Sequence, residues 1–152
     1  MLGEEINTAL KHAMKARDQR RVSALRLIIA AIKNAEIEAQ MRGRESLGNE
    51  DLLALMQRMI KQRQESLEIY EKAGRKELAE KERGEIEIIS AYLPQQMSEA
   101  EVKAAVAEAA KQVGAQGIKD MGKVMAALKQ AHAGRMDFAK ASTMVKTMLV
   151  GS

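Results

Sequence analysis

Hydrophobic residues recur three and four positions apart along most of the chain, which is the spacing of one face of an α-helix. The pattern predicts a first helix over Glu4–Arg17. A second helix follows, with Asp18 as its expected N-cap, and it fades at residues 41–43. Leu27 and Ile28 widen the apolar stripe of this second helix, so we expect the helix to be buried on more than one side.

A long third helix and a charged fourth helix are expected after a polar, glycine-bounded loop at residues 43–48. Asn49 is the expected N-cap of the third helix. This helix ends at Ala73–Gly74, because glycine adopts the left-handed conformation of a helix C-terminus at little cost. The fourth helix covers Arg75–Leu93, and the ring of Pro94 prevents its continuation.

The last third of the chain predicts three short helices, at about Glu99–Val113, Met121–Ala131 and Phe138–Leu149. Ser98 and Glu101 have the spacing of a capping box, in which each residue's side chain accepts a hydrogen bond from the other's backbone. Asp120 and Asp137 stand where the N-caps of the two following helices are expected.

Composition supports an all-α fold class. Strong helix formers dominate the chain, which has one proline and ten glycines. We place a domain boundary near residues 95–97, after the helix that Pro94 ends. The expected architecture has two helical subdomains: an N-terminal long-helix bundle at residues 1–96 and a C-terminal three-helix module at residues 97–152.

Several kinds of active site are not supported by the sequence. The chain has no cysteine, which excludes disulfides, thiolate nucleophiles and cysteine-bound metals. Its two histidines, His12 and His132, fall in different predicted subdomains and lack the neighbours of a metal-binding motif. No GxSxG, GxxxxGK[ST] or GxGxxG motif is present. We therefore predict no catalytic residue, no metal and no cofactor.

The sequence also predicts a soluble, cytoplasmic protein with no membrane partner. No apolar run approaches the roughly 18 residues that a membrane-spanning helix needs. The first five residues, Met1–Glu5, include two glutamates and no apolar core, which is unlike a signal peptide.

Charge is divided into three zones along the chain. Residues 11–63 hold 12 Lys/Arg against 6 Asp/Glu, residues 65–101 hold 5 against 10, and residues 109–152 hold 7 against 2. Two interpretations are open. The zones neutralise one another across helix pairs, or the C-terminal basic zone faces the phosphates of an RNA. The charge pattern, taken alone, favours neutralisation.

Arg63 lies near the apolar stripe of its helix, one turn from Met59 and Leu67. A guanidinium there must be paired or must extend its head into water. One interpretation is an ion pair between helices, with Glu82 or Glu85 as the partner. The other makes Arg63 a partner-binding residue in a groove at the helix pair. Charges near a core are usually paired, which favours the first interpretation.

Three segments near the end of the chain resemble the C-terminal domain of the GatB/YqeY family: Ile118–Met125 (IKDMGKVM), Gly134–Asp137 (GRMD) and the stripe Val145, Met148, Leu149. That domain is the tail module of the B subunit of glutamine-dependent tRNA amidotransferases. An earlier stretch, KQRQES…IYEKAGRKELAEKE…EIEIISAYLPQQMSEAE, is similar to the N-terminal region of free-standing YqeY-like proteins. The resemblance therefore covers almost the whole chain.

The resemblance implies a module that holds the elbow of a tRNA while other domains perform the chemistry. The chain has neither amidase nor kinase motifs, so we expect no enzymatic activity from the chain alone. We expect it to bind tRNA or another structured RNA. The resemblance and the C-terminal basic zone together give the candidate phosphate contacts Lys119, Lys123, Lys129, Arg135, Lys140 and Lys146.

Two alternatives to RNA binding remain open. The first is a protein-interaction adaptor, supported by the region around Arg63, the methionine-rich stripes and an exposed face of the second helix. The second follows from the family label: a component of a carbon–nitrogen ligase that takes its amido nitrogen from glutamine.

Overall fold

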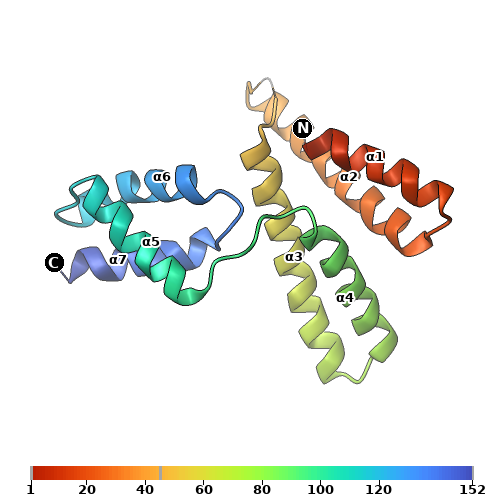
Figure 1. Cartoon of the computed structure of the whole chain (residues 1–152). Helices are drawn as coiled ribbons and strands as arrows, with labels where there is room; N and C mark the ends of the chain where they lie inside the picture. Colours follow the sequence, from red (N-terminus) through yellow and green to blue (C-terminus); the bar gives the residue numbers. More distant parts are fainter. Residues whose placement is uncertain (1, 45, 152) are drawn as a thin grey trace. The chain divides into compact units, whose positions relative to one another are not determined.

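The computed structural model describes residues 2–44 and 46–151, and all regular secondary structure in that part of the chain is helical (Figure 1). The described helices are α1 (Leu2–Lys15), α2 (Gln19–Met41), α3 (Asn49–Lys72), α4 (Lys76–Ser90), α5 (Glu99–Gln112), the short 3₁₀ helix η1 (Ile118–Asp120), α6 (Met121–His132) and α7 (Phe138–Val150). The predicted all-α class is confirmed.

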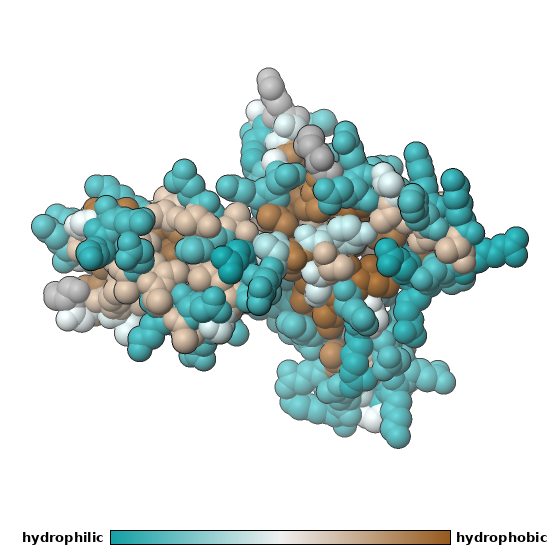
Figure 2. Space-filling view, in the orientation of Figure 1, coloured by the Kyte–Doolittle hydropathy of each residue, from teal (hydrophilic) through white to brown (hydrophobic). Residues whose placement is uncertain are grey.

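The helices form two compact groups, an N-terminal unit at residues 1–93 and a C-terminal unit at residues 94–152. Each unit has its own hydrophobic core, and the two cores share no residue. On the visible face in Figure 2, hydrophobic side chains of the N-terminal unit are mostly darker brown than those of the C-terminal unit. Isoleucine and leucine dominate the first core, whereas alanine, valine and methionine dominate the second.

The N-terminal unit consists of two helical hairpins, α1–α2 and α3–α4 (Figure 1). Helix α2 packs against α1, α3 and α4, which confirms that it is buried on more than one side. The largest side chains with less than 2% exposure are Ile6, Leu25, Ile28, Met56 and Ile89. Burying a side chain of this size contributes about 1.5–3 kcal/mol, so these residues hold the two hairpins together.

The prediction that Leu27 widens the buried stripe of α2 is wrong. Leu27 is 44% exposed, whereas its neighbour Ile28 is fully buried. Successive residues of a helix point about 100° apart, so only one of the two faces the hairpin interior.

The ends of the first four helices follow local hydrogen bonding. Asp18 caps α2 as predicted, because its carboxylate accepts from the backbone N–H of Arg21 at 3.2 Å. Asn49 is not the cap of α3. Gly48 occupies that position, and its N–H donates to the carboxylate of Asp51 at 3.0 Å. Gly74 has φ +71°, which confirms the left-handed turn predicted after α3.

Helix α4 is shorter than predicted at its C-terminal end. It stops at Ser90, and a turn containing Tyr92 and Leu93 precedes Pro94. The N–H groups of Tyr92 and Leu93 each donate to the carbonyl three residues earlier, the tighter pattern that often closes a helix. The residue before a proline is also disfavoured in helical conformation, which moves the helix end upstream.

In the C-terminal unit, α5, α6 and α7 all contact one another around a core that includes Val106, Val124, Leu128, Ala141 and Val145. The capping box of α5 is confirmed, with Ser98 and Glu101 exchanging two hydrogen bonds of 3.1 Å. Asp137 caps α7 as predicted, accepting from the N–H groups of Ala139 at 2.9 Å and Lys140 at 3.4 Å.

Asp120 departs from its predicted capping role. It precedes α6, but its carboxylate does not bond to that helix. It accepts instead from the backbone N–H of Gln116, at 2.9 Å. The 3₁₀ helix η1, which the sequence pattern did not predict, tightens the chain before α6 and turns this carboxylate back toward the loop.

Candidate nucleic-acid interface

Six cations were predicted to contact RNA, and the C-terminal unit presents them from three kinds of structure. Lys119 lies in η1, Lys123 and Lys129 lie on α6, and Lys140 and Lys146 lie on α7. Arg135 lies in the turn between α6 and α7. All five lysines are exposed, and Arg135 is half-buried.

Lys119 and Lys123 lie on either side of Asp120 in sequence, and both act on its carboxylate. The pKa of Asp120 is lowered from its ordinary value, first by the hydrogen bond from the N–H of Gln116 and then by that of Gly117. The charges of Lys123 and Lys119 lower it further. The local group therefore carries two positive charges against one negative charge.

Arg135 is fixed by hydrogen bonds within the C-terminal unit. Its Nε donates to the carbonyl of Gln95 at 3.1 Å, and its own carbonyl accepts from the N–H of Met97 at 2.9 Å. Beside it, Nε2 of Gln96 donates to the carbonyl of Gly134 at 2.7 Å. These bonds join the segment before α5 to the turn before α7, so Arg135 is held in a defined position.

A hollow in the C-terminal unit brings Arg135 together with Lys140. Its walls come from the start of α5, the turn at residues 134–137 and the start of α7. The other lining residues are Gln96, Met97, Glu99, Val102, Met136, Asp137 and Met144. The sequence pattern did not predict this hollow, because it depends on how the three helices pack. Its one sequence signal is the Gly134–Asp137 segment.

The six cations do not form a single patch. Lys123 and Lys129 are six residues apart on α6, which places them about 120° apart around the helix axis. The same spacing separates Lys140 from Lys146 on α7. The structure therefore groups Lys119 with Lys123 and Arg135 with Lys140, and it directs the remaining two lysines to other faces.

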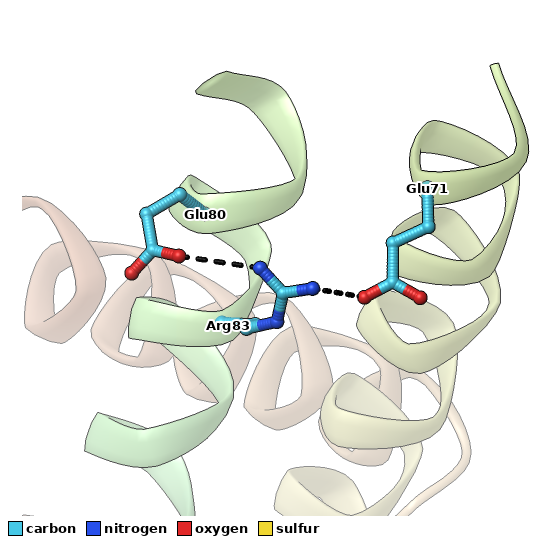
Figure 3. A network of polar contacts seen from close by, with 3 residues as sticks. All are labelled: Glu71, Glu80 and Arg83. Carbon is cyan, nitrogen blue, oxygen red and sulfur yellow. Dashed lines mark hydrogen bonds and ion pairs between the residues drawn. The ribbon is translucent and has the colours of Figure 1, made fainter. Parts of the chain in front are cut away.

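Several ion pairs join charged side chains within the N-terminal unit. In the N-terminal unit, Arg83 contacts both Glu80 of its own helix and Glu71 of α3 (Figure 3). Ion pairs also join Arg44 to Asp51 and Lys72 to Glu68. Within residues 94–151, none of the five candidate lysines has a carboxylate partner within 4.0 Å.

Arg63 is paired inside its own unit. Its Nε donates to Oε2 of Glu85 at 2.9 Å, and Nη1 donates to the carbonyl of Met59 at 3.1 Å. The side chains of Arg63 and Glu85 are 15% and 8% exposed. The ion-pair interpretation is thus confirmed, with Glu85 as the partner. This pair links the N-terminal basic zone to the acidic zone, and a partner-binding role for Arg63 stays a prediction.

Glu82 lies near this pair, and its carboxylate is in a less favourable environment than that of Glu85. Its Oε2 atom is buried and has no hydrogen-bond partner among the described residues. Burial raises the pKa of Glu82 above its ordinary value, and the charge of Glu85 adds to that rise. The charges of Arg63 and Lys81 oppose it. The sequence pattern offered Glu82 as a candidate partner of Arg63. It did not predict that one of its carboxylate oxygens would be buried without a hydrogen-bond partner among the described residues.

No group of three or more histidine, aspartate or glutamate side chains among the described residues is arranged to hold a metal ion. None of the helices at residues 2–44 and 46–151 is long and apolar enough to cross a bilayer.

The fold and its charge distribution define an all-helical protein with a compact cationic C-terminal unit. The family model described as Yqey-like protein matches residues 3–149, which is almost the entire chain. The chain belongs to this YqeY-like family, and the resemblance inferred from its motifs is confirmed.

Fungal relatives match part of the chain. "Altered inheritance of mitochondria protein 41, mitochondrial" of Lachancea thermotolerans is 41% identical over 99 residues, covering 64% of this chain and 51% of the relative. The protein of the same name in Eremothecium gossypii is 34% identical over 84 residues, covering 55% and 44%. The chain spans about half the length of these curated relatives. Their names place them in mitochondria, and the cytoplasmic location predicted for this chain stays a prediction.

Proposed function

We propose that this chain is a non-catalytic module that binds tRNA or another folded RNA through the phosphates that face its C-terminal unit. The observation that supports this most strongly is the set of five exposed lysines that have no carboxylate partner among the described residues. An ammonium without a protein partner is available to a phosphate, and displacement of counterions from the RNA then drives binding. The resemblance of the C-terminal segments to the tail module of tRNA amidotransferases supports the choice of tRNA.

The C-terminal unit favours shape and phosphate contacts over base stacking. Phe138 is its one aromatic side chain, and it is half-buried against the core. Proteins that bind single strands generally stack bases on exposed aromatic rings. A folded RNA offers a fixed array of phosphates and 2′-hydroxyls that cations and backbone groups can contact without stacking.

The test is a tRNA-binding titration at several salt concentrations with the triple variant Lys119→Ala/Lys123→Ala/Arg135→Ala. Each lost phosphate contact lowers the slope of log K against log salt by roughly 0.7–0.9, so the triple variant should bind more weakly and lose roughly two units of slope. The double variant Lys119→Ala/Lys123→Ala leaves the Arg135–Gln95 hydrogen bond intact. It should show a proportionate part of the loss.

The matched control is Lys11→Ala/Lys15→Ala/Arg21→Ala. It removes two lysines and one arginine from exposed positions of the N-terminal basic zone, so the change in net charge is the same. We expect this control to keep most of the affinity and slope. Equal losses in both triple variants would show attraction to net charge alone, and unchanged binding in the C-terminal variant would refute the proposed interface.

We expect no glutamine-dependent amidotransferase activity from the chain alone. Ammonia release from glutamine in the presence of ATP and a mischarged tRNA measures this directly. Release above the level of a blank reaction would favour the ligase alternative over a binding module.

A further inference from the structure

Helix α2 has a second apolar face that points to solvent. Leu27, Ile37 and Met41 are 44%, 56% and 83% exposed. Ala30 and Asn34 lie between them and are also exposed. The five residues are spaced three, four, three and four apart, which is the spacing of the a and d positions of a coiled coil. We call these five residues the outer seam.

The outer seam is separate from the face that α2 uses inside its own unit. The buried residues Val22, Leu25 and Ile28 belong to the core of the N-terminal unit, and they follow a different stripe of the same helix. Isolated apolar residues are common on protein surfaces and need no explanation. Here three large ones share one heptad stripe with suitable flanking charges, which is a pattern for recognising another helix.

We propose that the outer seam pairs with the outer seam of a second copy of this chain, as a parallel two-stranded coiled coil. The flanking charges argue for this occupant. With Leu27, Asn34 and Met41 at a positions, Lys33 falls at g and Glu38 at e. In a parallel pair the g residue of one helix faces the e residue five positions later on its partner. Lys33 of each copy would then face Glu38 of the other. The two-fold axis relates the two copies, so the dimer would contain two such ion pairs.

An antiparallel pair of the same seams lacks this complementarity. In that arrangement g faces g, so Lys33 lies opposite Lys33 in one alignment and opposite Gln40 in the other. The first alignment brings like charges together, and the second gains no ion pair. The charge pattern therefore selects the parallel orientation.

Asn34 gives a second argument for a parallel pair of identical chains. At an a position of a parallel dimer it meets the Asn34 of the other copy, and the two amides can hydrogen-bond across the axis. In an antiparallel pair an a residue meets a d residue, which here is Ala30 or Ile37. Neither side chain can bond to the amide, and leaving a buried polar group without a partner costs about 1–3 kcal/mol.

The dimer should be weak. The seam covers two heptads, whereas sustained coiled coils usually need at least three or four. Sedimentation across roughly 10–500 µM, a range suited to weak complexes, should therefore show a monomer–dimer equilibrium. A chain that stays monomeric at the highest concentration overturns the proposal.

A charge exchange tests whether the partner of the outer seam is a second copy of this chain. Lys33→Glu alone and Glu38→Lys alone each place like charges opposite one another, so each variant should be monomeric where the original chain dimerises. An equal mixture of the two variants restores both ion pairs and should form a heterodimer. Circular dichroism checks that the variants remain folded. Failure of the mixture to associate, or dimerisation of either variant alone at the original strength, overturns the proposal.

Orientation can be tested because the chain has no cysteine. In a parallel dimer Asn34→Cys should form a disulfide between the copies under mild oxidation, since Cα atoms must approach within about 7 Å for that bond. Glu36→Cys is the matched control, because it is exposed on the same helix but lies off the seam. Equal cross-linking of both variants overturns the parallel seam.

The variant Leu27→Lys tests for a different protein partner. If it loses such a partner, and the original chain does not self-associate, the seam belongs to that protein and the proposal is overturned.

Discussion

Arg63 and Glu85 form the most enclosed ion pair found among the described residues, with 15% and 8% of their side chains exposed. Removing two charges from water is costly, and their attraction repays much of that cost only while both are present. The pair therefore contributes little net stability compared with two apolar side chains. Its main consequence is that neither partner can be removed alone without penalty.

Arg63→Met should destabilise the N-terminal unit by about 3 kcal/mol, because Glu85 is left charged and buried without its partner. The double variant Arg63→Met/Glu85→Met should recover most of this loss. Urea unfolding followed by tyrosine fluorescence measures both, since Tyr70 and Tyr92 both lie in the N-terminal unit. A loss below about 1 kcal/mol in the single variant would mean that water or another group solvates Glu85.

Glu82 gives a prediction with a definite pH dependence. Its pKa is raised by burial and by the charge of Glu85, so the folded state holds this proton more tightly than the unfolded chain does. The ionised form is therefore destabilising at neutral pH, and that cost disappears as pH falls through the folded pKa toward the unfolded value. Glu82→Gln should raise the free energy of unfolding at neutral pH, and the gain should vanish below about pH 4.

The control for this experiment is Glu87→Gln, an exposed position on the same helix. Both variants remove one negative charge from α4, so a difference between them isolates the effect of burial. The same tyrosine-detected urea titration, repeated across the pH range, follows both. A gain for Glu82→Gln that persists unchanged in acid would contradict the argument.

At the scale of the helix, the sequence predicted features that depend on a few neighbouring residues. The caps Asp18 and Asp137 and the box of Ser98 and Glu101 are correct, because each bond spans two or three residues. The prediction for Asn49 failed because Asn49 is already the first residue of α3. The cap position falls on Gly48, whose N–H donates to the carboxylate of Asp51.

Features that depend on packing between helices could not be predicted. Glu82 and Glu85 are three residues apart and share one face of α4, so the sequence left both open as partners of Arg63. Only the register of α3 against α4 selects Glu85. The exposure of the candidate lysines follows from their charge. Their grouping around Asp120 and around the hollow depends on how the helices pack.

Removing the cap of α7 should weaken the C-terminal unit. Asp137→Ala deletes the acceptor for two N–H groups at the start of the helix, which typically costs about 1 kcal/mol. Asp137→Asn keeps an acceptor at the same position and should retain most of the stability. Thermal unfolding by circular dichroism compares the two variants. If both variants unfold at the same temperature, and that temperature is lower than for the original chain, the carboxylate charge matters and the cap geometry does not.

At the scale of the whole molecule, the two hydrophobic cores share no residue, so whether the units are independent folding domains is a direct question for experiment. A unit of about 60 residues buries only about 60% of the surface of its unfolded chain and is marginally stable. A single destabilising substitution in its core should therefore lower its stability strongly. The stability of the other unit should stay unchanged if the two cores fold separately.

Ala141→Asp tests this separation, because Ala141 is fully buried in the C-terminal core and a buried carboxylate without a partner is strongly destabilising. We expect circular dichroism to show loss of the C-terminal helices and the tyrosine-detected midpoint of the N-terminal unit to stay unchanged. Ile6→Asp is the reciprocal variant, since Ile6 is fully buried in the other core, and it should abolish the tyrosine transition.

Affinity for tRNA should be lost with Ala141→Asp and largely kept with Ile6→Asp. A joint shift of both probes in either variant would show one cooperative unit, and the boundary between the cores would then have no thermodynamic meaning.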